Sequence, residues 1–215
     1  GELIQYSYQV AGTVGLMMAP ILDAKNNKSF SFAISPSLLY NAVMKRLVIG
    51  ISGASGAIYG IRLLELLRDV DGIETHLVMS GSAKITIGLE TTFTPAQVEA
   101  LADVTYRSND IAAAISSGSF RTMGMVVMPC AMKTLSGIAH SFSTNLLLRA
   151  ADVTLKERRR LLIVSRETPL HLGHLRLMTQ VAELGGIIMP PTPAFYHRPQ
   201  TIDDIVDQTV NRVVE

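Results

Sequence analysis

The chain has 215 residues, 48% hydrophobic and 17% charged, and its 19 Lys and Arg nearly balance its 18 Asp and Glu. This balance excludes a strongly basic nucleic-acid-binding surface, and no apolar run reaches the roughly 20 residues that span a bilayer. The single cysteine excludes an intramolecular disulfide framework and favours a cytoplasmic protein. The low charged fraction indicates that other subunits cover part of the surface.

The chain changes in character at Met44. Residues 1–43 hold an apolar stretch broken by Gly12, Gly15 and Pro20, without the basic region or cleavage site of a secretory signal. From Met44 onward, apolar runs alternate with glycine turns and amphipathic windows. We therefore expect residues 1–43 to be a leader outside the domain, and residues 44–215 to form one α/β domain.

In chain order, apolar runs predict buried strands and amphipathic windows predict helices. Strands that alternate with helices favour a doubly wound parallel sheet with helices on both faces and ligands at its carboxyl edge. The strands are expected at 47–51, 75–79, 125–128, 161–164 and 187–189, the third being ended by Pro129. The helices are expected from 58 to near Asp71 and at 82–89, 95–102, 134–139, 145–158, 174–184 and 201–214, the last with a capping box of Thr201 and Asp204.

The segment from Gly50 to Gly56 joins the first strand to the first helix. Small residues let the backbone approach an anion, the helix N-terminus offers free N–H groups, and Ser55 adds a hydroxyl. The spacing of Gly50, Gly53 and Gly56 is neither a dinucleotide fingerprint nor a Walker loop, so it suits a mononucleotide phosphate better than NAD or ATP. An ordinary tight turn explains the same residues equally well.

A second loop, from Pro129 to Thr134, also follows a buried strand and is expected at the same edge of the sheet. It is either a second ligand loop or a plain connection. Cys130 is interpreted as a small buried side chain, because no His or Asp partner stands at a spacing that would suggest a nucleophile.

Cationic side chains gather between residues 149 and 160. Arg149 and Lys156 are seven residues apart and therefore lie on one face of the predicted helix, where two cations suit a phosphate. Arg158, Arg159 and Arg160 are interpreted as a solvated helix end, favourable near the negative end of the helix dipole.

Two later segments extend the same edge of the sheet. Arg166 and Glu167 follow the 161–164 strand, either as a structural ion pair or as an acid/base site. The proline-stiffened loop 189–199 carries Tyr196, and its stiffness favours a binding role over a bare connection. The histidines have no metal-ligand spacing, so no metal site is predicted.

Residues 44–215 resemble the UbiX-type flavin prenyltransferases in long, ordered stretches. These are GISGASGAIYGIRLL, ETHLVMS, ISSGSF, PCAMKTLSGIAH, RAADVTLKERR, RETPLHLGHLRLM and MPPTPAFYHRPQTIDDIVDQTVNRV. The resemblance implies a flavodoxin-like fold, FMN as cofactor and a homo-oligomer, typically a dodecamer. It further implies transfer of a dimethylallyl group from dimethylallyl phosphate to N5 and C6 of reduced FMN, with the product passed to a UbiD-type decarboxylase.

The resemblance also implies roles for individual residues. The implied catalytic set is Ser55, Glu90, Lys156 and Glu167, with the two glutamates as acid/base carboxylates. The implied FMN site comprises Gly53, Ala54, Ser55, Ser80, Ala131, Met132, Lys133, Thr134 and Arg166. The implied prenyl-phosphate site comprises Ser55, Arg149, Lys156, Tyr196 and Arg212, and no metal takes part.

Three features depart from the family pattern. Ala131 stands where the family commonly has Ser, so we expect the backbone N–H of that loop to serve instead and cofactor binding to be weakened. The C-terminal extension usual in the family does not follow Glu215. Residues 1–43 resemble a fragment of the squalene and phytoene synthases, but they carry neither aspartate-rich motif of those enzymes.

Two alternative functions stay open at this point. The first is an FMN-dependent decarboxylase of the cysteine-decarboxylase kind, although the catalytic His and the Asn-containing clamp of that chemistry are not found at matching places. The second is a non-catalytic flavin-binding subunit, inactive because of the Ala131 change or the missing extension.

Overall fold

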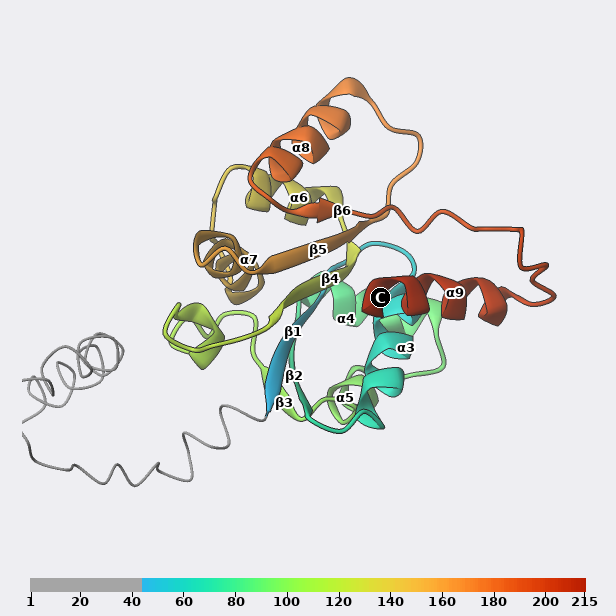
Figure 1. The fold of residues 1–215 in the computed structure, drawn as a ribbon, viewed down its shortest axis with the longest axis horizontal. Coiled ribbons are helices and arrows are strands. Elements are labelled where there is room, and N and C mark those ends of the chain that lie inside the picture. Colours follow the sequence, from blue (N-terminus) through green and yellow to red (C-terminus); the bar gives the residue numbers. More distant parts are fainter. Residues whose placement is uncertain (1–43) are drawn as a thin grey trace, which may run out of the picture. The chain divides into compact units, whose positions relative to one another are not determined.

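The computed structural model describes residues 44–215, which form a six-stranded, all-parallel sheet in the order β3-β2-β1-β4-β5-β6 (Figure 1). The strands are β1 (Lys45–Ile51), β2 (Ile73–Met79), β3 (Val104–Tyr106), β4 (Gly124–Cys130), β5 (Arg160–Ser165) and β6 (Ile187–Ile188). If the short edge strand β3 is left out and the others are renumbered, the order becomes 2-1-3-4-5, which is that of flavodoxin-like folds. The predicted doubly wound sheet is therefore confirmed.

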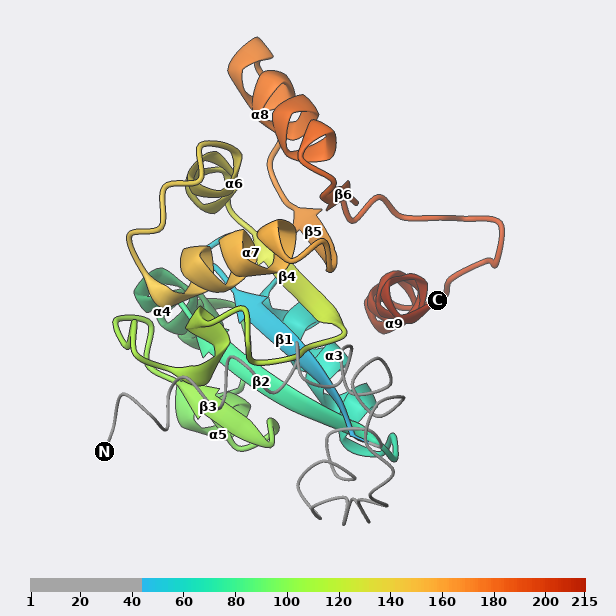
Figure 2. The ribbon, with the colours of Figure 1, turned by 60° about the vertical axis from the view of Figure 1, so that its left-hand side comes forward.

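Helices cover both faces of the sheet, as the two views show (Figures 1 and 2). One layer packs on the face that carries Val48, Met125 and Ile163, and the other packs on the face that carries Ile49 and Val126. The first layer consists of α6 (Met132–Ala139), α7 (Leu146–Lys156), α8 (Leu172–Glu183) and the 3-10 turn η1 (Ala114–Ser116). The second consists of α3 (Ala57–Arg68), α4 (Gly81–Glu90), α5 (Pro95–Glu99) and α9 (Ile202–Val214).

The central strands read as unbroken apolar runs because both of their faces are buried. All seven residues of β4 and the last four of β1 are buried. A parallel sheet covered in this way brings the carboxyl ends of all its strands to one edge, and the order reverses between β1 and β4. That switch point is where ligands bind in doubly wound folds.

The structure shifts several predicted boundaries, those of β4 and α7 among them, and it adds one strand. β4 runs through Pro129 to Cys130, because the pairing with β5 shifts register between Val127 and Cys130 and such an irregularity tolerates a proline. Helix α7 ends at Lys156 rather than Arg158, whose φ of 55° lies in the left-handed region. β3 has only three residues and pairs with β2 alone, which is too short for a periodicity to reveal.

The predicted capping box of α9 is confirmed: the Thr201 hydroxyl accepts from the N–H of Asp204, and the Asp204 carboxylate accepts from the N–H of Thr201. The predicted leader 1–43 lies outside the described residues. Within residues 44–215, no helix is long and apolar enough to cross a membrane.

Candidate functional site

A cavity of about 910 Å³ opens at the carboxyl edge of the sheet, beside the switch point. Its volume suits a small-molecule ligand. Five of its lining residues are among the predicted cofactor ligands, namely Gly53, Ser80, Ala131, Lys133 and Thr134. The structure adds Gly81, Ser82, Ser136, Gly137, His140, Phe142, Thr144, Asn145 and Leu148. Spacing offered a signal for two of these, because Ser136 and Gly137 lie three and four residues after Lys133 on one face of α6.

A buried serine that the sequence analysis missed holds the two loops of this cavity together. The Ser52 hydroxyl donates to the carbonyl of Pro129 at 3.0 Å and accepts from the N–H of Ala131 at 2.7 Å. The Ser52 N–H also donates to the Pro129 carbonyl. Among the backbone N–H groups of that loop, the one of Ala131 is therefore already bound by Ser52.

The cofactor loop instead offers the N-terminus of α6. The N-cap residue Ala131 has no side chain that could cap the helix, so the first turn of α6 begins without a side-chain acceptor. Its N–H groups and the positive end of its dipole suit an anion. By contrast, α4 is capped by its own Ser80, whose hydroxyl accepts from the N–H of Ala83 at 3.0 Å.

The glycine loop 50–56 places a different group at the start of α3. Gly56 is the N-cap and has a φ of 95°, a conformation that favours glycine. Oε2 of Glu90 accepts from the N–H groups of Gly56 at 2.8 Å and Ala57 at 3.3 Å. The carboxylate of Glu90 thus occupies the helix N-terminus that was predicted either to bind a phosphate or to be an ordinary tight turn. Ala54 is buried and Ser55 half-buried in the same turn.

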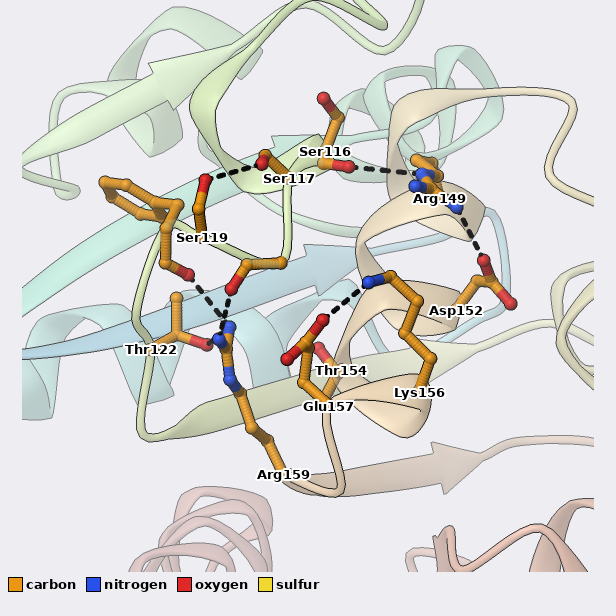
Figure 3. Close-up of polar contacts among 12 residues, drawn as sticks. Ser116, Ser117, Ser119, Thr122, Arg149, Asp152, Thr154, Lys156, Glu157 and Arg159 are labelled. Carbon is orange, nitrogen blue, oxygen red and sulfur yellow. Dashed lines mark hydrogen bonds and ion pairs between the residues drawn. The ribbon is translucent and has the colours of Figure 1, made fainter. Parts of the chain in front are cut away.

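The predicted cation pair of α7 lies against the loop formed by residues 116–122 (Figure 3). Nε of Arg149 donates to the carbonyl of Ser116 at 3.1 Å, and its Nη1 binds Asp152 at 2.8 Å. Nζ of Lys156 donates to Oε1 of Glu157 at 2.5 Å. This hydrogen bond holds the pKa of the Glu157 carboxyl below its usual value.

The other predicted residues do not line the cavity. Tyr196 is 86% exposed and shares a shallow hollow with Arg212, which forms an ion pair with Glu215. Arg166 and Glu167 are exposed just beyond β5. The Met132 side chain packs against the core rather than into the cavity. Within the described part of one chain, the predicted phosphate ligands therefore fall into separate groups, with Arg149 and Lys156 on α7 and Tyr196 beside Arg212.

Cys130 is fully buried, and burial raises the pKa of its thiol far above the usual range, which confirms its interpretation as a packing residue. Arg159, by contrast, does not belong to a solvated helix end. Its guanidinium donates to the carbonyls of Gly118 and Phe120. In residues 44–215, no group of three or more His, Cys, Asp or Glu is arranged to hold a metal ion.

A doubly wound sheet with a cavity at its switch point and an uncapped helix N-terminus beside it defines a nucleotide-binding α/β protein. Residues 37–214 match the family model of the flavoproteins. The chain is 69% identical over 172 residues to the flavin prenyltransferase UbiX of Escherichia coli K12, which covers 80% of this chain and 91% of that protein.

Two solved structures are similar as well. The dodecameric FMN-dependent UbiX-like decarboxylase from Escherichia coli O157:H7 gives a TM-score of 0.78 at 51% identity, over 79% of this chain and 92% of that one. AnUbiX (PadA1), solved in complex with FMN and dimethylallyl pyrophosphate, also gives 0.78 at 51% identity, over 80% of this chain and 90% of that one. The chain belongs to the flavoprotein family and, within it, to the UbiX flavin prenyltransferases.

Proposed function

We propose that this protein joins the dimethylallyl group of dimethylallyl phosphate to N5 and C6 of reduced FMN and supplies the product to a UbiD-type decarboxylase. The observation that carries the proposal is the cavity at the switch point, in a chain 69% identical to a flavin prenyltransferase. A relative at 51% identity was solved with FMN and dimethylallyl pyrophosphate, which supports the same pair of ligands here.

The residues around the cavity fit a flavin mononucleotide. The uncapped N-terminus of α6 would bind an anionic group, while Ser80, Lys133 and Thr134 supply polar contacts along the wall. Part of this wall requires glycine, because a Cβ on Gly53 would lie only 2.3 Å from Oγ of Ser82. When bound and reduced, the flavin supplies the nucleophile.

The remaining residues act on the prenyl phosphate. Departure of phosphate from an allylic carbon leaves negative charge that fixed cations and hydroxyls must stabilise. We assign this role to Ser55, Arg149, Lys156, Tyr196 and Arg212, with no need for a metal. Four elements place these five residues: the turn before α3, helix α7 with both Arg149 and Lys156, the segment after β6, and helix α9.

Two carboxylates are assigned to proton transfer. Glu90 is anchored at the start of α3 through Oε2, beside Ser55 in the same turn. Glu167 follows β5 next to Arg166, and its Oε1 accepts from the N–H of Thr168 at 3.0 Å. We propose that these two groups exchange protons with the flavin and the phosphate as the new bonds form.

We further propose a cytoplasmic homo-oligomer, dodecameric like its solved relative from Escherichia coli O157:H7. Large apolar side chains are exposed on α8 and in the segment after β6, including Leu172, Leu175 and Phe195, and neighbouring copies would cover them. We place residues 1–43 outside the catalytic domain. The flavoprotein model matches residues 37–214, so it leaves out the first 36 residues of this segment.

The test is to incubate the full chain with FMN, a reductant and dimethylallyl phosphate, and to weigh the released flavin by mass spectrometry. We expect the flavin to gain the mass of one prenyl unit. A protein that binds FMN normally but yields no adduct would refute the proposal and favour the non-catalytic subunit. Carbon dioxide released from a peptidyl-cysteine without a UbiD partner would favour the decarboxylase instead.

A further inference from the structure

Arg159 ties together two segments that are far apart in the sequence (Figure 3). Its Nη1 donates to the carbonyl of Phe120 at 2.8 Å and to Oγ1 of Thr122 at 3.3 Å, while Nη2 donates to the carbonyl of Gly118 at 2.6 Å. The planar guanidinium suits this arrangement because its fixed donors can bind several acceptors at once. The side chain is partly buried in the process.

The loop that Arg159 binds is the one that lies against the cations of α7. Arg149 holds the beginning of this loop through the carbonyl of Ser116, and Arg159 holds its middle and end. Within the loop, the hydroxyls of Ser117 and Ser119 are 2.8 Å apart. Two arginines ten residues apart in the sequence thus fix this loop: Arg149 binds it from within α7, and Arg159 binds it from just beyond the C-terminal end of α7.

Gly118 is the point at which this loop meets Lys156. A Cβ at Gly118 would lie 2.0 Å from Oε1 of Glu157 and 2.8 Å from Nζ of Lys156. The backbone at Gly118 therefore forms a wall against the Lys156–Glu157 pair, and the position of that wall depends on the carbonyl that Arg159 holds. A small shift of the loop would displace the ammonium group.

We propose that Arg159 is a positioning residue for recognition of the prenyl phosphate. It acts through the loop 116–122, which sets where Lys156 and Arg149 present their charges. The inference rests on the proposed function, because it takes those two cations as phosphate ligands. It goes beyond that function because Arg159 does not line the cavity and is not assigned any contact with the substrate.

The test compares Arg159→Lys with Arg158→Lys, which makes the same change at the exposed neighbouring arginine. Lysine keeps the charge but cannot bind both carbonyls in a fixed plane. In Arg159→Lys, we expect KM for dimethylallyl phosphate to rise about tenfold, with a smaller change in kcat and an unchanged FMN dissociation constant. In Arg158→Lys, all three quantities should match the wild type.

A second variant reaches the same wall without touching Arg159. Gly118→Ala pushes on the Lys156–Glu157 pair and should also raise KM for the prenyl phosphate, whereas Gly88→Ala, where a Cβ meets nothing within 4 Å, should not. Without flavin, we expect dimethylallyl phosphate to raise the melting temperature of the wild type more than that of either loop variant.

These outcomes separate the inference from the proposed function. If the wild type forms no flavin adduct, the proposed function fails. If it does and Arg159→Lys leaves KM unchanged, or lowers kcat, FMN affinity and prenyl-phosphate affinity together, Arg159 is not a positioning residue. Should Arg159→Lys fail to fold, wild-type KM in Gly118→Ala would overturn the inference instead.

Discussion

The cavity edge of the sheet and the segments that carry the predicted phosphate ligands are held in different ways. Around the cavity, strand ends are joined by short hydrogen bonds, with Ser52 at their centre and only 1% exposed. Tyr196 and Arg212 stand on the segment after β6 and on α9, where Tyr196 is 86% exposed. The loops of the flavin half of the proposed site are thus joined by hydrogen bonds within one chain, whereas Tyr196 and Arg212 of the phosphate half present their side chains outward.

This difference indicates how the two halves depend on assembly. The strand ends beneath the cavity are fixed within one chain by the hydrogen bonds of Ser52. Exposed cations on separate elements can bind one phosphate together only when another surface brings them close to it. The exposed apolar side chains nearby are suited to contact with a neighbouring copy. Substitutions in the two regions should therefore have different consequences for flavin binding, prenyl transfer and stability.

The largest expected effect is on the phosphate side. Lys156→Ala should lower kcat/KM for prenyl transfer by roughly a hundredfold or more, because one fixed cation facing the developing phosphate charge is lost. FMN affinity should not change, since Lys156 does not line the cavity. Quenched time-course assays with mass detection measure kcat/KM, and fluorescence titration measures FMN affinity. An unchanged transfer rate would contradict the assigned role of Lys156.

The next effect is on the cavity side. Ser52→Ala leaves the part-buried N–H of Ala131 without its acceptor and removes the hydrogen bond to Pro129, so the free energy of unfolding should fall by about 1–3 kcal/mol. FMN should also bind more weakly, because the α6 N-terminus is no longer fixed to β1. Urea unfolding and flavin titration provide the two measurements.

Ser165 offers a matched control for Ser52. It is also buried, at 2% exposed, and it is the last residue of β5 as Ser52 is the first after β1, but among residues 44–215 its hydroxyl has no hydrogen-bond partner. Ser165→Ala should therefore cost much less stability than Ser52→Ala. Equal losses for the two variants would mean that the Ser52 bridge contributes nothing beyond packing.

A smaller effect is expected for Tyr196→Phe, which removes only a hydroxyl. If that hydroxyl contacts the prenyl phosphate, KM should rise by about tenfold, the loss of one hydrogen bond to a charged group. Urea unfolding of the variant should match the wild type, because the side chain is exposed. Loss of stability without a change in KM would assign Tyr196 to packing between copies instead.

The smallest effect concerns the start of α9, which carries Arg212. The N–H groups of Gln200 and Thr201 donate to Asp204 and hold the pKa of its carboxyl below its ordinary value. A lowered pKa in the folded state adds stability above the unfolded pKa, near 3.8, that is lost as pH falls through the folded value. Asp204→Asn should thus be slightly destabilising at pH 7, with the difference shrinking in acid, as urea unfolding across pH would show.

Much of the fold was predictable from local patterns. Buried parallel strands read as apolar runs, and the capping box of Thr201 and Asp204 is a fixed spacing. The short strand β3 gave no such pattern, because three residues at the edge of a sheet carry almost no periodicity. The five predicted residues that line the cavity follow strand ends, which topology brings to one edge.

What the sequence determined by itself was the doubly wound fold, the family and the set of polar residues at the strand ends, since these depend on order along the chain. Only the tertiary structure decided how Ser52 and Arg159 are used. Ser52 meets Ala131 across 79 positions of the sequence, and Arg159 meets Gly118 across 41. Such contacts leave no local spacing to read, because folding rather than sequence neighbourhood sets the partner.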